Sequence, residues 1–270
     1  MPPAEARQRL DAEGAAYAQP SPRQLYVHDD LSDLVRRRHG LESPAAELTR
    51  ELFTLLARGP DRVRVLTLSE QLDRVIAQGD HAPFEVAIGI GRAGERVAEA
   101  LHAREGWFPR VVVVGLTREE DGRGGYRLAS TEPADLASQL ARVGEPASLA
   151  IVDDTVFSGL TMRSVLEGLP PAVRSRTHAF CLRVVTASID SIAALCPITA
   201  GVSAAGRLLH DVSFINASGL VLRISIRRQG QPPLAFFDRP DWIRAWFPGA
   251  DAEVLAVCRR LNALLEAERR

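Results

Sequence analysis

Short apolar runs alternate with amphipathic stretches over the middle of the chain. The runs are apolar on both faces, which is typical of strands buried between two layers, and they span residues 84–91, 110–116, 148–154 and 178–185. Apolar residues recur at helical spacing over residues 93–106, 133–142, 160–168 and 188–196. Strands that alternate with helices predict a parallel sheet with helices on both faces. We therefore expect an α/β core over residues 82–206.

The segments on either side of this core have other patterns. Leucines recur at helical spacing within residues 43–59, and residues 68–79 predict a second helix. We therefore expect an N-terminal helical extension over residues 1–81. Residues 207–270 are expected to form a small C-terminal cap, with an edge strand and a final helix, within one integrated domain.

Composition and charge narrow the classes of protein that fit. The chain has 270 residues, of which 46% are hydrophobic and 25% charged, as is typical of a soluble globular protein. Its formal net charge of −1 favours neither nucleic acid nor a membrane surface as a partner. No apolar run approaches the roughly 20 residues that cross a bilayer, and residues 1–20 lack the short apolar core expected of a secretory signal. We expect a cytoplasmic protein, and we expect it to form a homodimer.

The usage of cysteine and of basic residues limits the chemistry further. Cys181, Cys196 and Cys258 are widely spaced in apolar surroundings, so we expect core residues rather than zinc ligands or disulfides. The chain has no lysine, and all 33 basic residues are arginine. Any phosphate-binding cation must therefore be a guanidinium, with its planar fork of donors.

A glycine turn follows the first strand of the core. Gly89, Gly91 and Gly94 fit the G-x-G-x-x-G pattern of dinucleotide-binding turns. That interpretation requires an acidic residue at the end of the second strand, where this chain has Leu116 and Thr117. The next residue, Arg118, suits a 2′-phosphate. An NADP-dependent oxidoreductase therefore stays open as an alternative.

The most specific segment is LAIVDDTVFSGLT, residues 149–161. An apolar strand ends at the adjacent carboxylates of Asp153 and Asp154, which point to opposite faces of a sheet. A short turn then leads into a helix whose first amides can hold an anion. Helix capping by Asp153 explains one carboxylate, but not the pair together with Ser-Gly-x-Thr. The segment suits a ligand with both a diol and a phosphate, such as a phosphorylated ribose.

This segment resembles the phosphoribosyl pyrophosphate (PRPP) loop of the type I phosphoribosyltransferases. In that family an apolar run leads to two acidic residues, three variable positions, Thr or Ser, Gly, any residue, and Thr or Ser. Every position matches, with Leu160 where Gly is common. The resemblance covers residues 82–206 and implies a type I phosphoribosyltransferase-like fold with Mg²⁺ as cofactor. The implied partners are PRPP and a small-molecule acceptor.

The resemblance also implies a set of site residues. Asp153 and Asp154 would contact the ribose and the Mg²⁺ shell, and Arg118 would assist catalysis. The 5′-phosphate cradle would comprise Thr155, Val156, Phe157, Ser158, Gly159, Leu160 and Thr161. The pyrophosphate turn would comprise Gly91, Arg92, Ala93 and Gly94. Residues 117–127 would form the family's flexible loop, in which the available cations are Arg118, Arg123 and Arg127.

Two features of the sequence exclude common acceptors of the phosphoribosyl group. Phe157 stands where 6-oxopurine members of the family have an aspartate that contacts the purine, which argues against a hypoxanthine or guanine acceptor. The loop has no lysine, unlike orotate-type members. We expect a less common acceptor, such as a precursor of a specialised metabolite or antibiotic. A PRPP-binding regulator with the same fold and no turnover is the alternative from another class.

Overall fold

The computed structural model describes residues 22–79, 81–120 and 126–267. The chain divides into two compact units. The first comprises residues 1–68, 119–127 and 208–270, and the second comprises residues 69–118 and 128–207.

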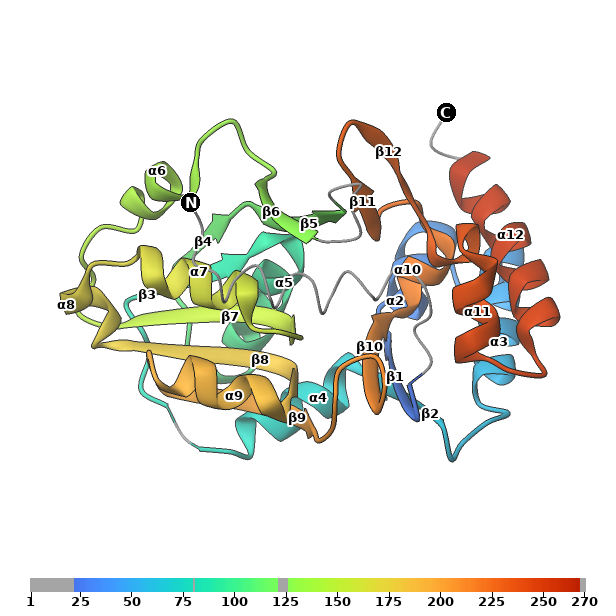
Figure 1. The fold of residues 1–270 in the computed structure, drawn as a ribbon, viewed down its shortest axis with the longest axis horizontal. Coiled ribbons are helices and arrows are strands. Elements are labelled where there is room, and N and C mark those ends of the chain that lie inside the picture. The colour runs from blue at the N-terminus through green and yellow to red at the C-terminus, as the bar shows by residue number, and fades with distance from the viewer. Residues whose placement is uncertain (1–21, 80, 121–125, 268–270) are drawn as a thin grey trace. The chain divides into compact units, whose positions relative to one another are not determined.

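The second unit is built on a five-stranded parallel sheet (Figure 1). Its strand order is β4 (Val111–Val114), β3 (Val86–Ile90), β7 (Leu149–Val156), β8 (Thr177–Val185) and β9 (Ile198–Ala204). The helices of the core are α5 (Gly91–Glu105), α6 (Leu136–Ala141), α7 (Leu160–Gly168), α8 (Pro171–Arg174) and α9 (Thr186–Ala193). Helix α4 (Leu68–Ile76) begins at the boundary of this unit. The prediction of a parallel sheet with helices on both faces is confirmed.

The core of this unit explains why its strands are apolar on both faces. Every residue of β3 is buried. Alternate residues of β3 and β7 pack with α6, α7 and α9 in one apolar cluster, while α5 packs against β3, β4 and β7. The buried Cys181 and Cys196 belong to that cluster. Cys258 is buried in the other unit, so all three thiols are core residues, as predicted.

The first unit is built from segments that lie before and after the second unit in the sequence. Its parallel sheet has the order β10 (Val212–Asn216), β1 (Gln24–Asp29), β2 (Val63–Thr67). The helices of this unit are α2 (Leu31–His39), α3 (Pro44–Leu56), α10 (Ala217–Val221), α11 (Pro240–Trp246) and α12 (Asp251–Ala267). The structure thus adds two strands to the helices expected in residues 1–81. Because β1 pairs with β10, the N-terminal and C-terminal segments share one sheet instead of forming an extension and a separate cap.

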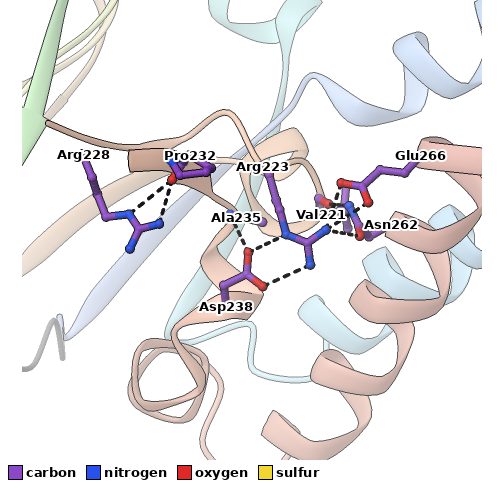
Figure 2. Close-up of polar contacts among 8 residues, drawn as sticks. All are labelled: Val221, Arg223, Arg228, Pro232, Ala235, Asp238, Asn262 and Glu266. Carbon is purple, nitrogen blue, oxygen red and sulfur yellow. Dashed lines mark hydrogen bonds and ion pairs between the residues drawn. The ribbon is translucent and has the colours of Figure 1, made fainter. Parts of the chain in front are cut away.

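A network of polar contacts fastens α12 within this unit (Figure 2). Arg223 donates from Nε to Asp238 at 3.0 Å, and from Nη1 to Asn262 at 3.0 Å and Glu266 at 2.9 Å. Asp238 ends a short 3₁₀ helix, η2 (Phe236–Asp238). One guanidinium therefore ties η2 to the last helix.

Residues 117–127 are expected to form a flexible loop, of which residues 121–125 lie outside the described residues and the rest belongs to two strands. These are β5 (Leu116–Glu120) and β6 (Tyr126–Ser130), in a sheet of order β12, β11, β5, β6. The other members are β11 (Ile226–Arg228) and β12 (Gln231–Leu234). Apart from Leu116 the residues of β5 are polar, and the strand lies between β6, which follows it in the chain, and the distant β11. Strand pairing, and not an apolar pattern, therefore makes these residues extended.

Candidate functional site

The carboxyl ends of β3 and β7 lie side by side. Gly89 of β3 pairs with Val152 of β7, so α5 begins at Gly91 beside the strand end that carries Asp153. The chain goes from β3 to β4 on one side of β3 and returns to β7 on its other side. In open α/β sheets, ligands bind outside the carboxyl ends of the strands at such a switch point. The two turns singled out in the sequence therefore meet where this type of sheet binds ligands.

The two carboxylates of the motif lie in the last half of β7 and have different partners. Asp154 forms an ion pair with Arg183 of β8, with 3.0 Å between Oδ2 and Nη2. Arg183 has a fully buried side chain, and its Nε donates to the Thr155 hydroxyl at 2.9 Å. Asp153 accepts the backbone amide of Asp154 at 2.8 Å. A buried cation thus fixes the second carboxylate, and a backbone amide orients the first.

Burial and neighbouring charges shift the ionisation of the first carboxyl group. Burial and the negative charge of Asp154 raise the pKa of Asp153 well above its usual range, and the positive charge of Arg118 opposes that shift. A carboxyl with a raised pKa keeps its proton more readily, and it can then both donate and accept hydrogen bonds. Asp153 and Asp154 therefore offer hydrogen-bond partners for the hydroxyl groups of a ligand at this strand end.

The turn after the carboxylates is shorter than expected. Thr155 and Val156 still belong to β7, where they pair with Arg183 and Val184. Only the residues from Phe157 to Thr161 form the turn and the start of α7. Of the seven residues predicted for the phosphate cradle, Thr155 and Val156 thus end the strand, because its pairing with β8 extends past the acidic pair.

The turn itself has the features of an anion site. Gly159 has a φ of 76° and, as the N-cap residue, offers no side chain to the first amides of α7. The Ser188 hydroxyl donates to the carbonyl of Phe157 and fixes the turn from α9. Ser158 accepts the Leu160 amide at 3.4 Å. The predicted residues from Phe157 to Thr161 are thus gathered around one helix start.

The structure separates the candidate loop arginines. The Arg118 guanidinium lies over the ring of Phe157, with 5.1 Å between Cζ and the ring centroid. Arg127 forms an ion pair with Glu119 at 2.9 Å, in the first unit. Arg123 lies outside the described residues. Of the two described candidates, Arg118 is the one placed at the turn after β7.

The three glycines of the first turn each have a packing reason. A Cβ at Gly94 would lie 2.2 Å from the carbonyl oxygen of Val152, and one at Gly89 would lie 2.7 Å from the backbone of Glu95. Gly91 has a φ of 57°, which favours glycine. Close packing of α5 on β3 and β7 therefore requires this pattern without any dinucleotide.

The start of α5 is open to an anion. No side chain caps it, and its first turn has no acidic residue among Gly91, Arg92, Ala93 and Gly94. Arg92 is 87% exposed and forms an ion pair with Glu95 at 2.8 Å. The turn thus offers backbone amides, with an exposed guanidinium beside them.

The end of β4 disfavours the NADP alternative. A Cβ at Gly115 would lie 2.6 Å from the Thr131 hydroxyl and 2.9 Å from Glu132, so residues of the same unit cover this strand end. The fully buried Gln139 holds the arrangement by accepting the Gly115 amide at 2.6 Å and donating to Ser130 at 2.9 Å. A dinucleotide would place its adenosine ribose at this position.

Sequence reasoning missed Arg183 and Gln139. The signal for Arg183 was present, because an arginine within the apolar strand HAFCLRVV must have a buried partner. No comparable signal marks Gln139, which lies on an ordinary amphipathic helix.

The described residues hold no group of three or more His, Cys, Asp or Glu side chains that suits a metal ion. Among the described helices, none is long and apolar enough to cross a membrane.

Comparison with known proteins gave structural neighbours of low similarity. No family model matches the chain, and no curated protein sequence is significantly similar to it. A purine phosphoribosyltransferase from Pyrococcus horikoshii is 18% identical, with a TM-score of 0.36, over 54% of this chain and 86% of that chain. Adenine phosphoribosyltransferase (APRTase) from Giardia lamblia is 13% identical, with a TM-score of 0.34, over 56% of this chain and 84% of that chain. A hypothetical protein from Neisseria gonorrhoeae with bound ppGpp is 13% identical, with a TM-score of 0.35, over 54% of this chain and 80% of that chain.

Proposed function

We propose that this chain binds PRPP at the switch point between β3 and β7 and transfers the phosphoribosyl group to a small-molecule acceptor. One observation carries the proposal. The acidic pair lies at the end of β7, just before the start of α7, and β7 pairs with β3, which leads into the start of α5. Neither helix start has a side-chain cap from its N-cap residue. Two anion sites flanking a carboxylate pair match a ligand with a phosphate at one end, a diol in the middle and a pyrophosphate at the other.

Each group of residues has a role in this reaction. The amides from Phe157 to Thr161 bind the 5′-phosphate, and Asp153 and Asp154 accept the ribose hydroxyls. The amides at Gly91 to Gly94 bind the pyrophosphate, with the exposed guanidinium of Arg92 beside them, and Arg118 assists from the turn after β7. The acceptor attacks C1 of the ribose, the bond from C1 to the pyrophosphate oxygen breaks, and pyrophosphate leaves with the electron pair. The chain acts by orienting the reactants and neutralising the leaving group, without a covalent intermediate.

A magnesium ion fits the residues present. Mg²⁺ prefers oxygen ligands, is usually bound by one or two carboxylates together with substrate phosphates, and keeps several waters. Asp153 is a carboxylate whose ionisation is disfavoured by burial and by Asp154, so a cation would relieve it. Asp153 and Asp154 would hold the ion through water or ribose hydroxyls. The ion would supply positive charge to the pyrophosphate.

Calorimetry with PRPP, with and without Mg²⁺, tests the binding step. We expect the unaltered chain to bind PRPP with Mg²⁺, and both Asp153→Asn and Asp154→Asn to weaken that binding by about 10-fold or more, since a hydrogen bond to a charged group is lost. Glu145→Gln is the matched control. Glu145 is exposed and precedes β7, at the end of the strand away from the acidic pair. Failure of the unaltered chain to bind PRPP would overturn the proposal.

Release of pyrophosphate with a panel of acceptors separates an enzyme from a regulator. The proposal predicts release with at least one acceptor, and loss of that release in Asp153→Asn and Asp154→Asn. The acceptor proposed here is an uncommon small molecule, because Phe157 replaces the aspartate that would contact a 6-oxopurine. Tight PRPP binding without release across the panel would favour the regulator. Binding of NADP in place of PRPP would favour the oxidoreductase.

A further inference from the structure

Strand β8 carries a buried cation beside the acidic pair of β7. The side chain of Arg183 is fully buried, although its neighbours in HAFCLRVV are mostly apolar. The two strands lie side by side, and Arg183 pairs in register with Thr155, the residue after Asp154 (Figure 1). Taking a guanidinium out of water is unfavourable by several kcal/mol even in a relaxed protein interior. The sheet therefore keeps a charge at a place where charge is costly.

Two nitrogens of this guanidinium contact consecutive residues of β7. Nε donates to the Thr155 hydroxyl at 2.9 Å, and Nη2 donates to Asp154 Oδ2 at 3.0 Å. The contact with Thr155 fixes the guanidinium along β7, and the contact with Asp154 then fixes the direction of the carboxylate. Because the fork of donors is planar and rigid, a shift of the guanidinium weakens both contacts.

Asp154 is accessible to a ligand, whereas Arg183 is not. The Asp154 side chain is 16% exposed, and the Arg183 side chain is 0% exposed. A carboxylate has two oxygens with about four acceptor positions, so it can accept a guanidinium and ligand hydroxyls at the same time. A ligand at the end of β7 can therefore contact Asp154 but not Arg183.

Stability gives no reason for a charged pair at this place. Replacement of a buried ion pair by apolar side chains of similar volume is often neutral or stabilising. The guanidinium does restrict the Asp154 side chain before a ligand arrives, and a side chain that is already ordered loses less entropy on binding. The ion pair therefore serves the orientation of the carboxylate more than the stability of the sheet.

We infer that Arg183 is a positioning residue that holds the Asp154 carboxylate for the ribose hydroxyls of PRPP. The inference rests on the proposed function and adds to it how the chain distinguishes a ribose from a ring without hydroxyls. Arg183 does not touch the ligand and acts through Asp154. Thr155 belongs to the same arrangement, because its hydroxyl accepts Arg183 Nε.

The test compares two ligands that differ in their ring hydroxyls. Ribose 5-phosphate and tetrahydrofurfuryl phosphate have the same five-membered ring and the same phosphate, and only the first has hydroxyls on the ring. Calorimetry on the full chain measures both dissociation constants, and their ratio is the preference for ribose. We expect the unaltered chain to prefer ribose 5-phosphate by about 10-fold or more, because hydrogen bonds to charged groups are lost with the hydroxyls.

Arg183→Met should lower this preference about 3- to 10-fold, because the Asp154 side chain must then be ordered when the ligand binds. The affinity for tetrahydrofurfuryl phosphate should stay the same. Arg176→Met is the matched control and should keep the full preference, since Arg176 is exposed and precedes β8, at the opposite end of the strand from Arg183. A purely structural role for Arg183 would weaken both ligands equally and would overturn the inference.

Thr155→Val keeps the test decisive if Arg183→Met does not fold. It removes the hydroxyl that accepts Arg183 Nε, keeps both charges, and should lower the preference in the same direction. An unchanged preference in either folded variant would overturn the inference.

A double variant decides whether Arg183 acts through Asp154. In Asp154→Asn/Arg183→Met, the preference should be no lower than in Asp154→Asn alone. A further loss would overturn the inference. An unaltered chain that does not bind PRPP with Mg²⁺ would overturn the proposed function instead. If PRPP binds and the preference for ribose does not depend on Arg183, only the positioning role of Arg183 is refuted.

Discussion

Replacing Arg183 with methionine should destabilise the second unit through the charge it leaves behind. Arg183 is fully buried, and its partner Asp154 has a side chain only 16% exposed. Removing one member of a buried ion pair costs about 3–5 kcal/mol, because the other charge stays desolvated. Asp154 keeps some contact with solvent, so we expect the lower end, about 3 kcal/mol. Methionine fills most of the volume of the arginine stem, so the cavity contribution is small.

The double variant separates the charge from the packing. Asp154→Asn/Arg183→Met has neither charge, and we expect it to cost only about 1 kcal/mol relative to the unaltered chain. The coupling between the two substitutions should therefore be about 2 kcal/mol or more.

Hydrogen exchange measures this cost in the unit concerned. The chain has two units, so a single unfolding transition need not report on one of them. Amide exchange of peptides from β7 and β8, followed in low concentrations of urea, reports the opening free energy of that sheet directly. Additive costs in the double variant, or a cost below about 1 kcal/mol for Arg183→Met, would refute the reasoning.

Three further predictions follow from other contacts of the same unit. Gly94→Ala should destabilise the protein by several kcal/mol or prevent folding, since its Cβ would lie 2.2 Å from a backbone carbonyl oxygen. Thermal unfolding measures this loss, and Gly79→Ala is the control. It should leave the melting temperature nearly unchanged, because the nearest neighbour of its Cβ lies at 3.8 Å. Burial, helped by the charge of His81, lowers the pKa of His178 to about 4. The unfolded chain therefore binds the extra proton first, and stability present above about pH 6.5 should be lost as the pH falls towards 4, by about 1–2 kcal/mol after allowing for partial exposure. His178→Phe should flatten this part of the curve of stability against pH, and an unchanged slope would count against it. Asp153→Asn should raise stability at pH 7 while weakening PRPP binding, because the raised pKa of Asp153 makes its ionisation costly to the folded state. Equal or lower stability would contradict this.

The local order of residues predicted much of the second unit. Strands buried on both faces are apolar at successive positions, so the sequence predicts β3 and the first half of β7. It also predicts the helices that follow them. The carboxylates at the end of β7 and the turn to α7 are contiguous in the chain, so their juxtaposition also follows from local order. That is why a parallel α/β core and an acidic pair beside a helix start were both predicted.

The tertiary structure decided everything that depends on contacts between distant segments. The pairing of β1 with β10 joins residues nearly 190 positions apart, and no pattern within either strand specifies the other. The end of β5 pairs at Glu120 with Arg228 of the distant β11. Asp154 has its buried cation because β8 lies beside β7. The glycine pattern shows the limit most clearly. Its spacing in the sequence suggested a cofactor, whereas the structure shows that Gly94 makes room for the carbonyl of Val152, a neighbour that only the folded sheet brings there.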